Sequence, residues 1–539
     1  MNIKLLLKGN HTYSWTNSGN IYFLGYFFDS ENNLYRENEA VEFIVNQLKI
    51  NPLEEVCKRM NGNFSFIIFS ENQYSLVSDS VNFFPLFYKI ENEELIISNY
   101  WKSIVEYSSE FQLNTEAIDE FENAGFVLSD ETLDKNIYKT NANQILNIDP
   151  DSGKKNIIQY RNFITGTFSE KSFEELSVET ENVLMNVGKR LISFLNNRTA
   201  IVPLSGGYDS RLIVSLLKKM NYKNVICITY GKYNPEVPIS KKVAENLDYE
   251  WHFIDYQKID IEHFRKESRF SEYLEDAANG FAMPYLMEYF AAAELQKNGQ
   301  IPENSVFLPG HSGDFLGGSY IFKTVKNTID FQNLNSFIES KYFIFLQKNN
   351  RAKNQISERV KQSLKPIGKS YIQDGFNMTV EEWDIQEKLA KFIFHSSQVF
   401  NFFGFEVYFP LWDRELVDFF RKVPFRFREN KKLYDFVAEN AFFVPQNISF
   451  QKNELKVSKM RMFTQKIKDS VRYFFPWKMV LKRINNADWP NYQRLTEEML
   501  TFIENKKHKK FTHFKNYNAV ICVWYVEFLK EKYKSLRKV

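Results

Sequence analysis

Residues 202–210 read VPLSGGYDS, and the helix-like run RLIVSLLKKM follows directly at residues 211–220. This order predicts a strand, a tight loop and a helix N-terminus. Gly206 and Gly207 allow backbone N–H groups to turn inward, where they would bind phosphate oxygens. Asp209 would repel a phosphate, so its presence implies a divalent cation between the two. A plain strand-to-helix turn is the alternative interpretation of this stretch. The loop lacks the lysine of G-x-x-x-x-G-K-[ST], which argues against a Walker nucleotidase.

Length and composition describe a soluble globular protein of two or three domains. The chain has 539 residues, of which 44% are hydrophobic and 25% charged. It contains no window of eighteen apolar residues, and the opening MNIKLLLKGNHTYS turns polar too early for a signal peptide. We therefore expect a cytoplasmic protein. Its three cysteines, Cys57, Cys227 and Cys522, are too scattered for a disulfide framework or a zinc cluster.

The charge of the chain is unevenly distributed. The net charge is +2, but residues 451–539 carry 21 Lys and Arg against 8 Asp and Glu. This basic tail is either the solvated face of amphipathic helices or a surface for an anionic partner such as a phosphorylated substrate or a lipid. No nucleic-acid recognition motif accompanies the charge, so we expect no nucleic-acid partner.

The sequence pattern changes near residue 165. Before it, short β-like runs such as GNIYFLGYFF and NGNFSFIIFS alternate with turn residues, which predicts an antiparallel sheet domain over residues 1–165. After it, a long helical period is followed by alternating strands and helices, which predicts an α/β domain with a mainly parallel sheet over residues 166–539. Residues from about 325 onward have a mostly helical pattern.

The phosphate-binding stretch has three companions downstream. They are ITYGKYNPEVPISKKVAENLDYEWHFIDY, AMPYLMEYFAAAELQKNG followed by PGHSGDFLGGSYIF, and FGFEVYFPLWDRELVDFFRKVP. With LSGGYDSRLIVSLL, they resemble, in family order, the PP-loop ATP pyrophosphatases of the asparagine synthetase family, a fold of the adenine nucleotide alpha hydrolase type. The resemblance implies binding of ATP and Mg²⁺. The nucleotide contacts that it implies are Leu204, Ser205, Gly206, Gly207, Asp209, Ser210, Tyr230, Gly310, Ser312 and Gly313, and the metal ligands are Asp209 and Asp314.

The N-terminal region resembles the class II glutamine amidotransferase domain of the same family, which has an Ntn-like fold. The matching stretches are MNGNFSFIIFSENQYSLVSDSVNFFPLFY and LIISNYWKSIV. A working glutaminase of this type begins with a cysteine whose thiolate attacks the glutamine amide. Here Met1 is followed by Asn2, and no cysteine precedes Cys57. We therefore expect a scaffold without glutaminase activity.

The chain departs from the family pattern at several positions. PGHSGDFLGG is one residue shorter than the family loop S-G-E-G-S-D-E-L-F-G-G and carries one acid, so Asp314 replaces either its Asp or its Glu. His311 stands where the family often has Glu, as a hydrogen-bonding wall residue or as a substrate contact. Tyr408 replaces the arginine of E-x-R-x-P, which places aspartate as the acid substrate in doubt. The same match places Glu406 near the acyl site as a catalytic residue, with a plain surface carboxylate as the alternative.

The implied reaction is acyl adenylation. A carboxylate attacks the α-phosphate of ATP, pyrophosphate leaves, and an amine or ammonia then displaces AMP. The acid would be a small-molecule, peptide or sugar-acid carboxylate, as in enzymes of the β-lactam synthetase type. The nitrogen would come from a free amine, from ammonia or from a separate glutaminase. A catalytically silent nucleotide-binding scaffold of the same family is the alternative function.

A lysine is predicted to supply the positive charge for the adenylation step. The stretch VPQNISFQKNELK, from Val444, offers the spacing of the family segment V-P-x-x-I-x-x-R-K, with Gln451 at the arginine position and Lys452 at the catalytic lysine position. Alternatively, Lys452 simply opens the basic tail.

If Lys452 stabilises the transition state, Lys452→Ala should lose on the order of 100-fold in turnover at saturating ATP. Lys456→Ala is the control. Equal, small losses of turnover in both variants would show that Lys452 is an ordinary residue of the solvated tail.

Overall fold

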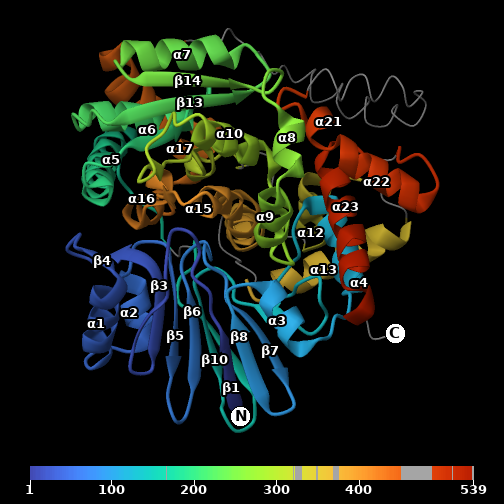
Figure 1. Cartoon of the computed structure of the whole chain (residues 1–539). Helices are drawn as coiled ribbons and strands as arrows, with labels where there is room; N and C mark the ends of the chain where they lie inside the picture. The colour runs from blue at the N-terminus through green and yellow to red at the C-terminus, as the bar shows by residue number, and fades with distance from the viewer. Residues whose placement is uncertain are drawn as a thin grey trace.

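The computed structural model describes residues 1–164, 167–319, 321, 331–346, 350–367, 375–450, 488–512 and 514–536. Figure 1 shows a strand-rich N-terminal half below a second half in which helices surround a sheet, with the C-terminal helices along one side. This arrangement confirms the predicted order of a sheet domain, an α/β domain and a helical C-terminal part. The predicted boundary, between residues 165 and 166, lies outside the described residues.

The N-terminal half contains two sheets. One runs in the order β11-β10-β6-β5-β3-β2, with β4 also paired to β3, and all of its pairs are antiparallel. The other runs β1-β8-β7-β9. The strands are β1 Asn2–Leu6, β2 Thr16–Ser18, β3 Ile21–Phe28, β4 Leu34–Arg36, β5 Phe64–Phe69, β6 Tyr74–Ser78, β7 Phe87–Glu91, β8 Glu94–Ser98, β9 Tyr138–Lys139, β10 Gln144–Ile148 and β11 Lys155–Gln159. Contrary to a purely antiparallel expectation, β1 pairs in parallel with β8, because these strands are joined by a long crossover and not by a hairpin.

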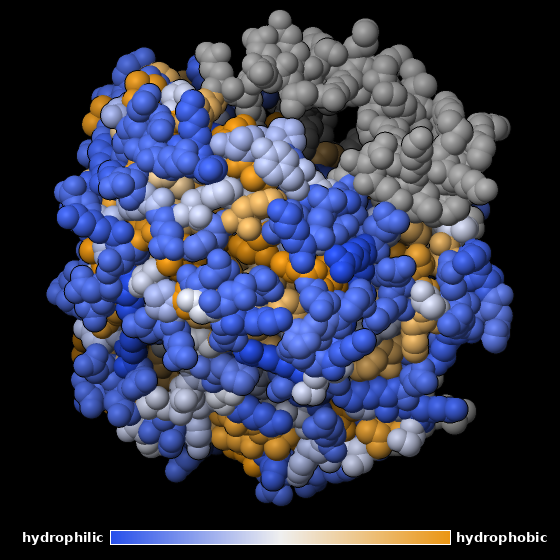
Figure 2. Space-filling view, turned by 45° about the horizontal axis from the view of Figure 1, so that its top comes forward, coloured by the Kyte–Doolittle hydropathy of each residue, from blue (hydrophilic) through white to orange (hydrophobic). Residues whose placement is uncertain are grey.

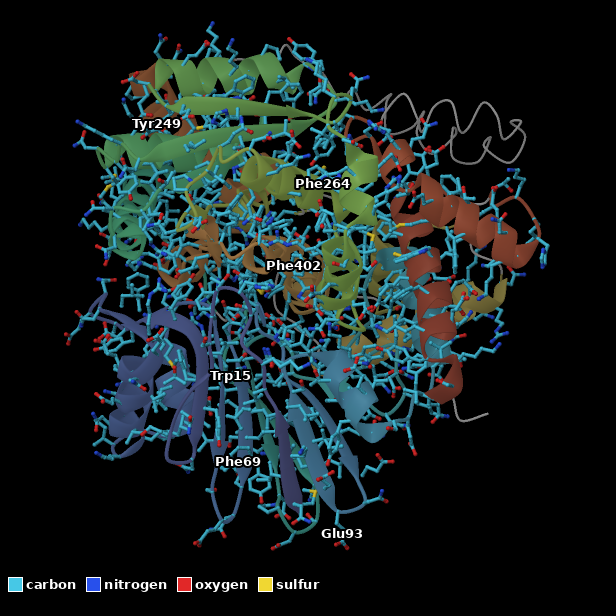
Figure 3. The ribbon with its side chains drawn as sticks, viewed as in Figure 1. Trp15, Phe69, Glu93, Tyr249, Phe264 and Phe402 are labelled. Atoms are coloured by element: carbon cyan, nitrogen blue, oxygen red, sulfur yellow. The ribbon has the colours of Figure 1, made fainter. Side chains whose placement is uncertain are left out.

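Alternation along the strands explains how the two sheets pack. In β5, Phe64 and Phe66 face the apolar cluster beneath the helices α1 (Glu37–Leu48) and α2 (Leu53–Arg59), while Ile67 faces the second sheet. Two further helices, α3 (Trp101–Ser108) and α4 (Thr115–Ala124), follow β8. Figures 1 and 3 show that the N-terminus and Glu93 lie at the end of this sandwich remote from the second half. There the amino group of Met1 donates to the Pro150 carbonyl at 2.8 Å.

The second half is built on a parallel five-stranded sheet in the order β14-β13-β12-β15-β16. Its strands are β12 Ala200–Pro203, β13 Val225–Gly231, β14 Glu250–Asp255, β15 Val306–Phe307 and β16 Glu406–Val407. The chain leaves β12 toward β13 and β14, and later returns on the other side of β12 to form β15 and β16. The strand order therefore reverses beside β12, and ligands of open α/β sheets bind at the carboxyl ends of the strands at such a point.

Helices cover this sheet and continue to the C-terminus. They are α5 Phe173–Leu195, α6 Tyr208–Lys219, α7 Glu236–Asn246, α8 Ile261–Lys266, α9 Ser268–Ala278, α10 Leu286–Lys297, α11 Gly313–Gly317, α12 Phe331–Tyr342, α13 Asn350–Leu364, α14 Gly375–Asp384, α15 Gln398–Phe402, α16 Arg414–Phe420, α17 Phe425–Arg428, α18 Lys432–Val437, α21 Tyr492–Leu495, α22 Glu497–Lys507 and α23 Asn518–Lys532. Two π-helices are η1 Ile385–Phe394 and η5 Ala438–Phe443. The described 3-10 helices are η2 His395–Ser397, η3 Pro410–Trp412, η4 Glu429–Lys431, η6 Val444–Gln446 and η8 Lys534–Leu536.

The C-terminal helices are more than a solvated face. Residues 519–523 of α23 are all buried, and the Tyr525 ring lies 5.9 Å from Phe121 in α4. Figure 1 shows α23 beside α4, so the end of the chain packs on the N-terminal half. This explains why an apolar run, ICVWYVEFL, occurs within a basic tail.

The two halves share one apolar core. A single cluster of buried side chains includes Leu24 and Trp101 from the N-terminal half and Phe402 and Leu411 from the second half. In Figure 3, Phe402 lies between the sandwich and the five-stranded sheet. Such burial fixes the relative position of the two halves, because separating them would expose apolar surface to water.

Buried polar contacts reinforce this interface. Asp413 accepts hydrogen bonds from Arg190 (Nε, 2.7 Å; Nη2, 2.8 Å), from Asn61 Nδ2 (3.0 Å) and from the backbone N–H of Glu415 (2.9 Å). Its carboxylate thus joins the N-terminal half, α5 and the first turn of α16.

The face of the molecule seen in Figure 2 is predominantly polar. Hydrophilic residues cover most of the face in Figure 2, and apolar residues form small, separate groups. Within the described part of the chain, every helix is too short or too polar to cross a bilayer.

Candidate active site

The loop after β12 has the strand–loop–helix geometry expected from residues 202–210. β12 ends at Pro203, and α6 begins at Tyr208, with Gly207 as its N-cap. Leu204 ties the loop to β13, since its N–H donates to the Ile228 carbonyl at 2.8 Å and its own carbonyl accepts from Thr229 Oγ1 at 2.8 Å. The N-terminus of α6 therefore opens at the carboxyl edge of the sheet.

Hydroxyl groups hold the backbone of this loop in place. The N–H of Ser205 donates to Ser210 Oγ at 3.1 Å, and the N–H of Gly207 donates to Ser205 Oγ at 3.1 Å. The N–H of Gly206 donates to the exposed carboxylate of Glu236 at 3.4 Å. Backbone donors gathered at a helix N-terminus are the groups that bind phosphate oxygens.

A second, glycine-rich loop follows β15 and packs against the first. A Cβ atom on Gly310 would lie 2.9 Å from the backbone nitrogen of Ser210. One on Gly313 would lie 2.3 Å from Tyr434 Oη and 2.8 Å from Asp209 Cγ. Ser312, between them, has a left-handed φ of 73°. Glycine is therefore required at 310 and 313, because larger residues would push the two loops apart.

Asp209 and Asp314 meet where the loops touch. The backbone N–H of Asp314 donates to Asp209 Oδ2 at 2.8 Å, and Tyr434 donates its hydroxyl to Asp209 Oδ1 at 3.0 Å. Burial and the neighbouring charge of Asp314 raise the pKa of Asp209 to about 6, although these hydrogen bonds oppose the shift. Asp314 accepts from Ser319 Oγ at 3.2 Å. The pair thus concentrates negative charge that a cation would neutralise.

These residues fit Mg²⁺ that is bound together with phosphate. In the described ranges no group of three or more His, Cys, Asp or Glu side chains could hold a metal by itself. Mg²⁺ usually takes one or two carboxylates and completes its octahedron with phosphate oxygens and water. Asp209 and Asp314, beside a phosphate-binding helix N-terminus, match that donor set.

Tyr230 is the next-to-last residue of β13, the strand that pairs with β12. Its hydroxyl donates to Glu288 Oε1 at 3.1 Å, and its ring stacks on Tyr256 with the centroids 6.3 Å apart. Burial raises the pKa of Glu288 to about 7. Tyr230 therefore lies at the carboxyl edge, as its predicted nucleotide contact requires, but its hydroxyl is already bonded to Glu288.

Glu406 lies apart from the nucleotide loops. It opens β16 in register with Val306 and hence with Ala200, the first residue of β12, so it lies at the amino edge of the sheet. Arg36 donates to its two oxygens at 2.9 Å each, and Arg198 lies 3.2 Å away. Although burial opposes it, these arginines hold the pKa of Glu406 below its ordinary value. Glu406 therefore joins the two halves at the amino edge of the sheet, and its catalytic role near the acyl site stays a prediction.

The two other departures from the family pattern are His311, which is half-buried, and Tyr408, which is buried. His311, on the glycine-rich loop, lies 3.1 Å from Ser397 Oγ through Nε2, and burial lowers its pKa to about 4. It is therefore a neutral imidazole at neutral pH. Tyr408 is buried, and its ring centroid is 4.8 Å from that of Phe194 and 6.2 Å from that of Tyr26. It fills the domain interface with aromatic surface.

Several residues at the site could not be predicted from the sequence motifs. Tyr434 bonds Asp209, and Lys431 places its ammonium 5.1 Å from the Tyr208 ring. Arg211, which is 1% exposed, donates to the Gly206 carbonyl at 2.8 Å and thereby supports the first loop. Tyr434 and Lys431 lie more than 200 residues from the motif that they support, so no local pattern marks them.

Lys452 and Gln451 lie outside the described residues. The preceding described residue, Phe450, has its ring 5.7 Å from the guanidinium of Arg211. The chain therefore passes close to the first loop shortly before Lys452, whose role stays a prediction.

The raised pKa of Asp209 predicts how stability depends on pH when ATP and Mg²⁺ are absent. Its pKa is about 6 in the folded protein against a reference of 3.8, so the group favours folding below pH 4 and loses that contribution as pH rises to 6. Asp209→Asn cannot ionise. The variant should therefore be more stable than the wild type above pH 6, by up to roughly 3 kcal/mol, and should lose this advantage near pH 4.

Urea unfolding between pH 4 and pH 8 measures this difference. Asp151→Asn, in an exposed turn of the N-terminal half, is the matched control and should show no such trend. A stability difference for Asp209→Asn that stays constant across this range would contradict the proposed environment of the carboxylate.

Comparison with known proteins agrees with this geometry. Residues 196–441 match the asparagine synthase family model, and residues 17–160 match the glutamine amidotransferase domain model. Asparagine synthetase [glutamine-hydrolyzing] 1 of Bacillus subtilis is 26% identical over 282 residues, which cover 50% of this chain and 41% of that protein. Putative asparagine synthetase [glutamine-hydrolyzing] 2 of Methanocaldococcus jannaschii is 24% identical over 250 residues, which cover 44% and 46%. The chain thus spans less than half the length of these relatives.

Among solved structures, an NH3-dependent NAD synthetase from Campylobacter jejuni is 12% identical and covers 40% of this chain and 94% of its own. The TM-score of this match is 0.20. The glutamine amidotransferase match covers the N-terminal sheet half, and the asparagine synthase match covers the α/β half. The two sequence relatives are asparagine synthetases. On these grounds the chain belongs to the asparagine synthetase family.

Proposed function

We propose that this protein is an ATP-dependent ligase that forms an amide by way of an acyl-adenylate. A carboxylate oxygen of the acid attacks the α-phosphorus of ATP, and the bond from that phosphorus to the bridging oxygen breaks, which releases pyrophosphate. The nitrogen of ammonia or an amine then attacks the acyl carbon, loses its proton, and displaces AMP. The observation that carries the proposal is the meeting of Asp209 and Asp314 at the N-terminus of α6.

Each part of the site has a role in this scheme. The backbone N–H groups of Gly206 and Gly207 would exchange their present acceptors, Glu236 and Ser205 Oγ, for phosphate oxygens, and Asp209 with Asp314 would hold Mg²⁺. When bound, Mg²⁺ supplies positive charge to the phosphates and so favours departure of pyrophosphate. The neutral ring of His311 accepts or donates a hydrogen bond at the wall of the glycine-rich loop without adding charge.

The nitrogen is not expected to come from glutamine hydrolysed by a cysteine of this chain. All three cysteines are buried. Burial raises the pKa of Cys227 to about 12 and shifts Cys57 and Cys522 in the same direction. Since the thiolate is the nucleophilic form, none of them is suited to attack an amide. A free amine, ammonia or a separate glutaminase would supply the nitrogen.

A pyrophosphate exchange assay tests the proposal. ATP, Mg²⁺ and labelled pyrophosphate are incubated with small, peptide and sugar-acid carboxylates, and an acid that is a substrate should drive label into ATP. Asp209→Asn should lose at least about 100-fold of this exchange, because a ligand for the cation is removed, while Asp151→Asn should keep it. The nucleotide product in the presence of an amine should be AMP.

The nitrogen source is tested in the same reaction. With glutamine as the sole nitrogen donor, the pure chain should release no glutamate, whereas ammonium or an amine should support product formation. ATP-coupled release of glutamate would contradict the proposed source. ATP binding without exchange for any acid would instead indicate a catalytically silent scaffold of the family.

A further inference from the structure

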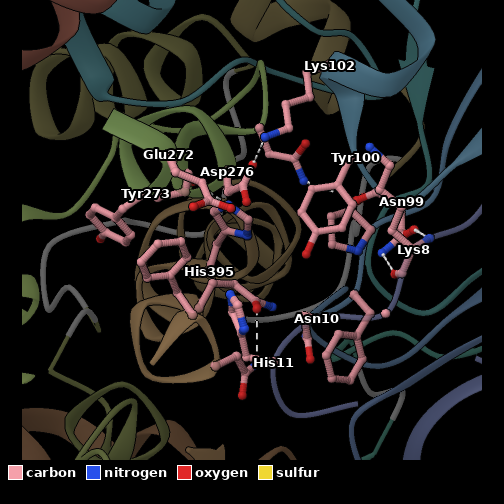
Figure 4. A pocket seen from close by; sticks show the side chains of 18 residues that line it. Lys8, Asn10, His11, Asn99, Tyr100, Lys102, Glu272, Tyr273, Asp276 and His395 are labelled. Atoms are coloured by element: carbon pink, nitrogen blue, oxygen red, sulfur yellow. Dashed lines mark hydrogen bonds and ion pairs between the residues drawn. The ribbon is translucent and has the colours of Figure 1, made fainter. Parts of the chain in front are cut away.

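A cavity of about 320 Å³ lies between the two halves of the molecule. Figure 4 shows it from close by. Its walls come from residues 8–11 and 99–102 of the N-terminal half, and from α9 and the segment 395–402 of the second half. None of its lining residues belongs to the loops after β12 or β15. Its volume is in the range of small-molecule sites, so the cavity is a candidate for a second ligand.

Two buried side chains in its wall have acceptor atoms without partners. His395 is 4% exposed, and its Nε2 donates to the Ala277 carbonyl at 2.9 Å, which leaves Nδ1 as an acceptor. Asn401 is 1% exposed, and its Nδ2 donates to Gln398 Oε1 at 3.0 Å. His395 Nδ1 and Asn401 Oδ1 have no hydrogen-bond partner in the described structure. Because an unpaired buried acceptor costs free energy, a ligand with N–H groups would be favoured here.

The charges on the α9 side of the cavity favour a cation. Glu272 and Asp276 lie next to each other there, and Lys8 lies on the opposite side (Figure 4). Asp276 is already neutralised by an ion pair with Lys102. Glu272 is exposed and has no ion-pair or hydrogen-bond partner among the residues that the structure describes. One carboxylate on this side thus remains uncompensated.

Aromatic rings complete the walls. Phe84, Tyr100, Tyr273 and Phe402 all line the cavity. Aromatic faces combined with carboxylates are the usual surroundings of a bound ammonium group, because the ring quadrupole attracts a cation. The acceptors, the free carboxylate and the rings therefore point to the same chemistry.

We propose that this interdomain cavity binds a small organic amine, with its primary ammonium group directed to Glu272 and to the acceptors of His395 and Asn401. The ligand is either a simple amine or an amino acid. The carboxylate of an amino acid would face Lys8. The site is also linked to the nucleotide half, since Ser397, in the same short η2 turn as His395, contacts His311 of the glycine-rich loop. The proposal goes beyond the ligase function and does not rest on it.

Isothermal titration of the full chain without ATP tests the site. The probes are 1,4-diaminobutane, L-ornithine as the amino acid of matching chain length, and 1,4-butanediol as the uncharged control. The diamine or ornithine should bind saturably, and the diol should not. Tighter binding of L-ornithine than of 1,4-diaminobutane would show that a carboxylate is also recognised. Tighter binding of the diamine would show that it is not.

Variants locate the binding. Glu272→Gln should weaken amine binding about 10-fold, because a charge-assisted hydrogen bond becomes a neutral one. Glu275→Gln is the matched control on the same helix, since Glu275 pairs with Lys532 and does not line the cavity. It should change binding less than twofold. Asn401→Leu, checked for folding by its thermal melt, should also weaken binding about 10-fold.

Three results would overturn the proposal: no saturable binding of either amine, equal binding of the diol, or an equal effect of the Glu272 and Glu275 changes. Because these titrations contain no ATP, they succeed or fail independently of the exchange assay.

Discussion

The hydrogen bond from the backbone N–H of Asp314 to the carboxylate of Asp209 is the contact around which the site is organised. It joins the loops after β12 and β15, the two strands between which the sheet order reverses. The contact is possible only because Gly310 and Gly313 leave room for the neighbouring loop. It also brings two acidic residues together in a partly buried place, which raises the pKa of Asp209. The fold thus gathers negative charge beside a helix N-terminus, where we propose that Mg²⁺ binds together with the phosphates of ATP.

The interface between the halves provides the second constraint. The buried Arg190–Asp413 pair, with Asn61 bonded to the same carboxylate, and the Arg36–Glu406 pair tie the sandwich to the α/β half. Removing one partner of the Arg190–Asp413 pair would leave a buried charge without compensation, so this contact favours one fixed arrangement. The N-terminal half therefore contacts the amino edge of the parallel sheet. It also contributes one wall of the interdomain cavity.

The sequence allowed the elements with local signals to be predicted. The glycines and the acid of residues 205–209 specified the first loop, and the change from alternating to helical periodicity separated the sheet domain from the α/β domain. Long-range contacts left no such signal. Glu406 was assigned by motif position to the acyl site, but the arginines that hold it come from β4 and from residue 198. Likewise, Tyr434 reaches Asp209 from α18, and the parallel pairing of β1 with β8 depends on a crossover that no short pattern encodes.

We propose that Asp209 and Asp314 jointly hold a cation on the phosphates of ATP. Calorimetric titration with the non-reacting analogue α,β-methylene-ATP tests it most directly, in the presence and absence of Mg²⁺, for the wild type and for Asp314→Asn. Mg²⁺ should strengthen binding at least about 10-fold in the wild type, since charge-assisted contacts of this kind are worth about 1.5–3 kcal/mol, and most of this gain should be lost in the variant. Equal affinity of the wild type with and without Mg²⁺ would contradict it.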